Sequence, residues 1–198
     1  MFRANYFFLF LLLGTSRGNA NVEYLSMFNE NEPVNRTKSH FKAQSSFANL
    51  FIYHDIPTLV DAQNTYNGSK CFLSIQRKGI WKVPASKWRN VNETGLEEDW
   101  ELALSTVIDE AASHFHSGAI SGFFLGDELA SRGVPVKNIT AVAAAIKSTL
   151  HSRNITGLVY LNEGAGPFDP NHAQYAGTWS GSIPPAIDLI SVDMYVHH

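Results

Sequence analysis

The stretch Ala119–Glu128 (AISGFFLGDE) places a strand pattern directly before two acidic residues. Its first part, Ala119–Leu125, predicts a strand that is apolar on both faces, as parallel strands covered by helices are. Asp127 and Glu128 follow at the strand end, and the next helical pattern begins only near Pro135. Functional groups of parallel α/β folds gather beyond the carboxyl ends of the strands. This stretch therefore indicates both the fold and the place of a site.

Strand and helix patterns alternate on both sides of this stretch. One helix pattern follows a capping-box sequence at Thr94–Glu97, and another is opened by Pro135. The strand patterns are Val22–Phe28, Asn49–His54, Lys70–Gln76, Ala119–Leu125, Gly157–Leu161 and Asp188–Tyr195. Such alternation predicts parallel strands joined by right-handed crossovers.

Two architectures fit this order. A six-strand open sheet would be complete within the chain, whereas a (β/α)8 barrel would need two more βα units and typically about 250 residues. No glycine-rich nucleotide-binding loop follows any strand, which removes the usual reason for an open doubly wound sheet. We therefore predict an α/β fold of the (β/α)8 TIM-barrel type that is incomplete, with about six of the eight βα units present.

Composition excludes several classes of protein. Of the 198 residues, 44% are hydrophobic and 12% aromatic, enough for a packed core and too many for a disordered chain. The net charge of −3 argues against a nucleic-acid partner, since a nucleic-acid binder would carry a basic stripe. Cys71 is the only cysteine, so no intramolecular disulfide forms.

The first twenty residues follow the pattern of a signal peptide. Arg3 precedes the apolar run Tyr6–Leu13, and Gly18 and Ala20 place small residues before a cut after residue 20. The run is shorter than the roughly 20 apolar residues of a membrane span, so no stable membrane insertion is expected. We predict a signal peptide over 1–20 and one partial barrel domain over 21–198, in a protein that is secreted or held in the secretory-pathway lumen, extracellular or lysosomal.

Glycosylation sequons support the same compartment. The chain carries five Asn-x-Ser/Thr sequons without an intervening proline, which predict a glycoprotein with exposed sugar-bearing loops. They lie at Asn35, Asn67, Asn92, Asn138 and Asn154.

Acidic groups end most of the predicted strands, among them Asp127-Glu128, Glu163 and Asp193. No nucleophilic Gly-x-Ser-x-Gly motif is present. The pair His114-x-His116 lies at the opposite end of the predicted sheet, so we expect neither a metal nor a cofactor. Convergent carboxylates near Trp179 and Tyr195 predict paired-carboxylate acid/base chemistry on a substrate that stacks against aromatic rings.

The segment Ser121–Glu128 resembles the fourth strand of (β/α)8-barrel glycoside hydrolases, and Ile187–Tyr195 (IDLISVDMY) is similar to their sixth strand. The resemblance implies that Glu128 is the acid/base and Asp127 its substrate-binding neighbour. It also implies that Asp193 and Tyr195 line the cleft.

In the large group of these enzymes with that acid/base, the nucleophilic Glu ends a seventh strand, whereas this chain stops after its sixth. Either a missing segment carries the second carboxylate, or Glu163 or Asp193 takes its role. We favour the missing segment and place Glu163 second, since adjacent strands lie about 4.8 Å apart and would bring Glu163 towards Glu128.

The function expected from this resemblance is that of a secreted glycoside hydrolase-like protein that cleaves O-glycosidic bonds in a carbohydrate or glycan by carboxylate acid/base catalysis. It would be inactive as a truncated chain if the second carboxylate lies beyond residue 198. The alternative is an inactive carbohydrate-binding pseudoenzyme on the same fold, which holds sugar through Trp179 and Tyr195. A metal-dependent barrel hydrolase is a third reading, weakened by the lack of a His-x-His motif at the first strand.

Overall fold

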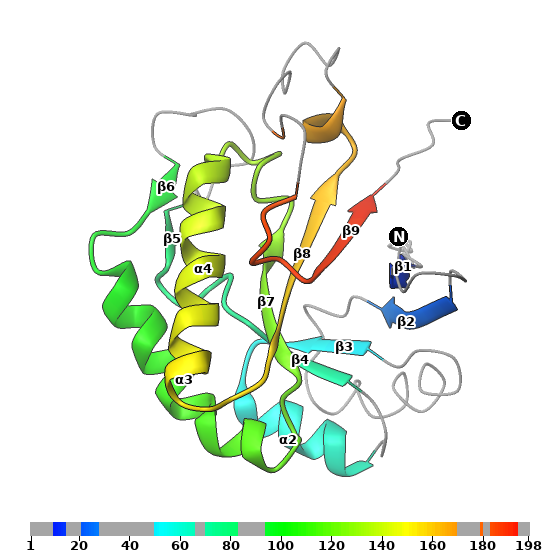
Figure 1. The fold of residues 1–198 in the computed structure, drawn as a ribbon, viewed down its shortest axis with the longest axis vertical. Helices are drawn as coiled ribbons and strands as arrows, with labels where there is room; N and C mark the ends of the chain where they lie inside the picture. The colour runs from blue at the N-terminus through cyan, green and yellow to red at the C-terminus, as the bar shows by residue number, and fades with distance from the viewer. Residues whose placement is uncertain are drawn as a thin grey trace, which may run out of the picture.

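The computed structural model describes residues 10–14, 21–27, 50–65, 70–82, 94–169, 179 and 183–193. At its centre five parallel strands form a curled sheet, which Figure 1 shows bending like half of a barrel. In spatial order they are β3 (Leu50–Tyr53), β4 (Lys70–Ser74), β7 (Gly122–Asp127), β8 (Leu158–Gly164) and β9 (Leu189–Asp193). The predicted α/β class with a parallel sheet is confirmed, while closure into an eight-stranded barrel is not shown by the described residues.

Two further strands extend the sheet beyond β3. Strand β2 (Asn21–Met27) pairs with β3 in parallel, and β1 (Phe10–Gly14) pairs with β2 in antiparallel fashion. Strand β1 therefore lies inside the segment predicted to be a removable signal peptide. The apolar core of a leader and a sheet strand use the same residue types, so this run satisfies both patterns.

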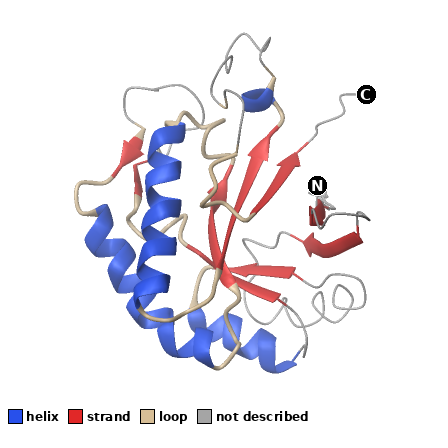
Figure 2. Ribbon diagram, viewed as in Figure 1, coloured by secondary structure: helices blue, strands red, loops and turns tan. Residues whose placement is uncertain are grey.

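Helices cover one face of the curled sheet, as Figure 2 shows, and we call this the helix face. They are α2 (Ile56–Thr65), α3 (Trp100–His116) and α4 (Val136–Ser152), with a short 3-10 helix η2 (Gly166–Phe168) after β8. Asp55 caps α2, since its Oδ1 accepts the Thr58 amide proton at 2.8 Å. As predicted, Pro135 stands immediately before α4.

The predicted capping box at Thr94–Glu97 is wrong. Helix α3 begins at Trp100 with Asp99 at its N-cap, and Gly95–Leu96 instead forms β6, which pairs with β5 (Trp81–Lys82). The Thr94 hydroxyl donates to the carbonyl oxygen of Gly133 at 2.6 Å, on the segment between β7 and α4. The Thr94 hydroxyl therefore binds a carbonyl distant in the sequence in place of the amides at the start of a helix.

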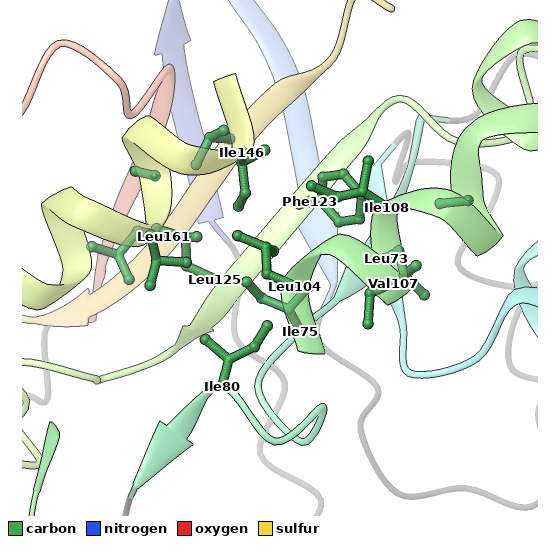
Figure 3. Packing of buried hydrophobic residues seen from close by; sticks show 14 of the residues in the cluster. Leu73, Ile75, Ile80, Leu104, Val107, Ile108, Phe123, Leu125, Ile146 and Leu161 are labelled. Carbon is green, nitrogen blue, oxygen red and sulfur yellow. The ribbon is translucent and has the colours of Figure 1, made fainter. Parts of the chain in front are cut away.

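The core divides along the alternation of the strands. Figure 3 shows the larger cluster, to which the sheet contributes Leu73, Phe123 and Leu161, α3 contributes Leu104 and Ile108, and α4 contributes Ile146. The opposite, inner face of the sheet carries a smaller cluster. Its buried members are Leu50, Ile52, Phe72, Phe124 and Tyr160. Successive residues of β8 therefore point to different environments: Val159 and Leu161 to the helices, Tyr160 to the inner face.

Within the described part of the chain, no helix has both the length and the apolar character needed to cross a bilayer.

Candidate functional site

The carboxyl ends of β7 and β8 bring three of the predicted site residues together. Asp127 is the last residue of β7 and lies opposite Asn162 in the β7–β8 ladder. Glu128 follows directly, and Glu163 comes one residue after Asn162. The regular ladder is interrupted between Phe124 and Asp127, so the end of β7 departs from ordinary strand geometry where the acidic residues begin.

Glu128 has a left-handed backbone conformation, with φ of 53°. Its amide donates to the carbonyl oxygen of Asn162 at 2.8 Å, and its own carbonyl accepts the Arg132 amide proton at 2.8 Å. The residue is 8% exposed. A Cβ added to Gly164 would lie 3.2 Å from Glu128 Oε1 and 3.0 Å from Ser131 Oγ. The absence of a side chain at Gly164 therefore leaves space for the Glu128 carboxylate.

Glu163 is fully buried beneath the segment that links β7 to α4. Its Oε1 accepts the Ala130 amide proton at 2.6 Å, while Oε2 accepts from the Ser131 amide and hydroxyl, both at 3.3 Å. Burial raises the pKa of Glu163 from its ordinary 4.5 to about 7. The hydrogen bonds from Ala130 and Ser131 oppose that rise, and the nearby Glu128 charge adds to it.

A row of hydrogen bonds crosses the inner side of the same edge. The Tyr160 hydroxyl lies 2.7 Å from Ser191 Oγ, and the Ser191 hydroxyl donates to Asn162 Oδ1. The Asn162 amide group then donates to Asp127 Oδ1 at 2.7 Å. Arg132 completes the row with an ion pair to Asp127 Oδ2 at 3.1 Å. We call these five residues the inner-face row.

Sequence reasoning missed Asn162, Ser131, Arg132 and Ser191 as members of this site. Asn162 stood beside Glu163 at a predicted strand end, so the position of the strand end was a usable signal for it. Ser191 lay within a predicted strand, where period-two alternation with Leu189 pointed to the same face. Ser131 and Arg132 lie in a connecting segment, and no periodic pattern points to such residues.

Three other predicted substrate-binding residues are Trp179, Asp193 and Tyr195, and the structure describes the side chain of Trp179 alone among them. Trp179 is buried in the helix-face cluster and stacks on Phe168, with ring centroids 5.7 Å apart and planes at 14°. Its environment is that of a core side chain. The backbone of Asp193 pairs opposite Gly164, while its side chain and the whole of Tyr195 lie outside the described residues.

Of the five predicted glycosylation residues, the structure describes two. Asn154 is exposed in the turn after α4, and Asn138 is half-buried on α4. Asn35, Asn67 and Asn92 lie outside the described residues. No group of three or more potential metal-ligating side chains occurs in the described ranges.

Comparisons with known proteins give one match, to a solved structure. No protein-family model matches the chain, and no curated protein matches it. Among solved structures, the chain is similar to a lysine/ornithine decarboxylase complexed with cadaverine from Vibrio vulnificus, at 14% sequence identity and a TM-score of 0.37. The match covers 69% of this chain and 32% of the decarboxylase, so the chain spans about a third of that protein's length.

These findings correct the resemblance to glycoside hydrolases. The matched structure is a decarboxylase, and the comparisons recover no glycoside hydrolase. Nothing in the comparisons supports the inferred family, the cleavage of O-glycosidic bonds or the carbohydrate-binding alternative, and we withdraw all three. The physical reason is that an Asp-Glu pair after an apolar strand is what many parallel α/β sheets present at their carboxyl edge.

The comparisons also give no support to the predicted signal peptide or to the description as a glycoprotein. Both inferences rested on short patterns near the chain's start and at isolated asparagines. Such patterns also arise by chance, so both inferences rest on the sequence alone.

Proposed function

We propose that the carboxyl edge of β7 and β8 is an acid–base centre, in which Glu128 exchanges a proton with a bound substrate and Glu163 holds a proton behind it. The observation that carries this proposal is the left-handed conformation of Glu128 at a nearly enclosed position.

Glu128 occupies a conformation that a carboxylate-bearing residue adopts at a cost. The left-handed region costs a residue with a Cβ about 1–2 kcal/mol, and glycine or asparagine would adopt it more readily. Its amide and carbonyl are both engaged, by Asn162 and Arg132, so the conformation is enforced by the surrounding structure. Strained residues of this kind concentrate at functional sites, where the strain fixes the direction of a side chain.

Glu163 supplies the second half of the pair. With a pKa of about 7 it is close to half-protonated at neutral pH, so it is able both to give and to take a proton. A site with two carboxyl groups divides their roles when their environments differ. Here Glu163 is completely enclosed, whereas Glu128 retains a small exposed fraction of 8%. We therefore assign contact with the substrate to Glu128 and proton storage to Glu163.

The test uses glycidol, a small epoxide that a carboxylate esterifies when an acid lies close by. Glu128 attacks the terminal epoxide carbon and forms an ester C–O bond, the epoxide C–O bond breaks, and the released oxygen takes the Glu163 proton. We expect mass spectrometry to find the ester on Glu128, with a rate that declines as the pH rises through about 7. Glu163→Gln should slow labelling by about a hundredfold, because the amide is no acid.

Glu110→Gln provides the matched control, since it makes the same chemical change on an exposed face of α3. It should leave the labelling of Glu128 unchanged. Labelling of Glu128 no faster than that of Glu110, or a rate that Glu163→Gln does not alter, would show that the two carboxyls do not act as an acid–base pair.

A further inference from the structure

We infer that Asn162 is a positioning residue that holds Glu128 in its left-handed conformation, and that Ser191 and Tyr160 in turn hold Asn162. The inference rests on the proposed function of Glu128, and it concerns the inner-face row, whose side chains take no part in the proposed proton exchange. Asp127 and its partner Arg132 form the charged end of this row.

The ion pair with Arg132 fixes the role of Asp127. A carboxylate that faces a guanidinium group is ionised and accepts hydrogen bonds without donating any. Asn162 must therefore turn its NH₂ group towards Asp127 Oδ1, as the 2.7 Å contact shows. The Asn162 amide oxygen is then directed to the other side, towards Ser191.

The remaining directions follow by counting protons. Ser191 has one hydroxyl proton, and it donates that proton to Asn162 Oδ1. Tyr160 must then be the donor in its 2.7 Å contact with Ser191. Every bond in the row thus points towards Asp127, and reversing any one of them would place two donors or two acceptors face to face. The row has a single low-energy arrangement, so the orientation of the Asn162 side chain is fixed.

Asn162 contacts both Asp127 and Glu128, the first through its side chain and the second through its main chain. Its side chain binds the Asp127 carboxylate, and its main-chain carbonyl accepts the Glu128 amide proton at 2.8 Å. Regular strand pairing is interrupted just before Asp127, so the ladder alone does not set this geometry. Asn162 and Tyr160 are both buried, which keeps water from competing for these bonds.

The experiment measures the Glu128 backbone directly. The three-bond coupling between the Glu128 amide and α protons depends on φ, so NMR reports whether the left-handed conformation persists. In Asn162→Ala we expect this coupling to change and glycidol labelling of Glu128 to slow by about a hundredfold in the folded protein. Ser191→Ala should produce a smaller change of the same kind, with labelling slowed by about tenfold.

Two further variants separate positioning from ordinary packing. Ser191→Thr keeps the hydroxyl and should restore the coupling and the labelling rate. Tyr160→Phe removes only the first donor of the row and should have an effect smaller than that of Ser191→Ala. Ser117→Ala, a matched change of an exposed serine at the end of α3, should alter neither readout.

The inference is overturned if Asn162→Ala folds and keeps the wild-type coupling at Glu128, whatever its melting temperature. If Asn162→Ala does not fold, an unchanged coupling in Ser191→Ala has the same meaning. Failure of the proposed function looks different. In that case wild-type protein is not labelled by glycidol, while the NMR coupling still responds to the two variants.

Discussion

Asn162 and Glu163 are neighbours in β8, yet they represent two ways of accommodating polar groups at the same strand end. Asn162 points to the inner face, where a row of neutral donors leads to an ionised, partly exposed carboxylate paired with Arg132. Glu163 points to the helix face, where burial is complete and its pKa is set by that burial, by hydrogen bonds from Ala130 and Ser131, and by the charge of Glu128. The inner face stabilises a charge by pairing it, whereas burial on the helix face raises the pKa of Glu163 and so favours its protonated form.

Residues of both faces act on Glu128 and on the segment that follows it. Hydrogen bonds from the inner face fix the Glu128 backbone. Glu163 fixes the segment that follows, because its carboxyl oxygens accept hydrogen bonds from the Ala130 and Ser131 amides. The effect of a substitution at Glu163 on the free energy of unfolding should therefore depend strongly on pH. A substitution in the ion pair between Arg132 and Asp127 should change the free energy of unfolding only slightly, and by an amount that depends on salt.

The largest effect is expected from the pH dependence of stability. Folded protein retains the Glu163 proton up to about pH 7, whereas the unfolded chain releases it near 4.5. The stability contributed by the raised pKa is complete below 4.5 and is lost as the pH rises through about 7. A pKa change of this size corresponds to about 3 kcal/mol in the free energy of unfolding.

Urea unfolding at pH 4 and at pH 8 measures this directly. The wild type should lose about 3 kcal/mol more between these two pH values than Glu163→Gln does, because the variant has no proton to release. Glu110→Gln, the exposed control, should follow the wild type within about 0.5 kcal/mol. Parallel curves for wild type and Glu163→Gln would mean that Glu163 titrates alike in the folded and unfolded states.

The smallest effect is expected at Arg132. Its ion pair with Asp127 is half-exposed, so Arg132→Gln should cost only about 0.5 kcal/mol of unfolding free energy, and less in concentrated NaCl. Arg153→Gln, which removes a comparable half-exposed pair with Asp109, is the matched control for stability. A loss of several kcal/mol in Arg132→Gln alone would show that the inner-face row depends on this cation far more than its exposure indicates.

The sequence predicted the elements with regular periodicity well. The helix pattern expected after Thr94–Glu97 is α3, whose apolar residues Leu104, Ile108 and Phe115 recur at helical spacing and are buried, and the strand predicted over Ala119–Leu125 is β7 at Gly122–Asp127. These predictions succeed because the alternation of apolar residues depends on local geometry alone. The capping box at Thr94 failed because a distant carbonyl, that of Gly133, binds its hydroxyl instead.

The candidate site was predictable only in part. Strand ends located Asp127, Glu128 and Glu163, because parallel strands place such residues on one edge. The sequence does not show that Glu163 is enclosed by Ala130 and Ser131, since the path of a connecting segment depends on tertiary contacts. The family resemblance failed for a related reason: a short strand with an acidic end specifies an edge of a sheet and says little about the reaction carried out there.

The central claim is that Glu163 shares its site with Glu128 as an acid whose pKa burial raises to about 7. It is tested most directly by a ¹³C NMR titration of the side-chain carboxyl carbons in protein labelled at glutamate, with the Glu163 signal assigned by its loss in Glu163→Gln. We predict a midpoint of about 7 for Glu163, which falls in Glu128→Gln because the neighbouring charge is removed. A midpoint near the ordinary 4.5, unchanged in Glu128→Gln, would contradict the account.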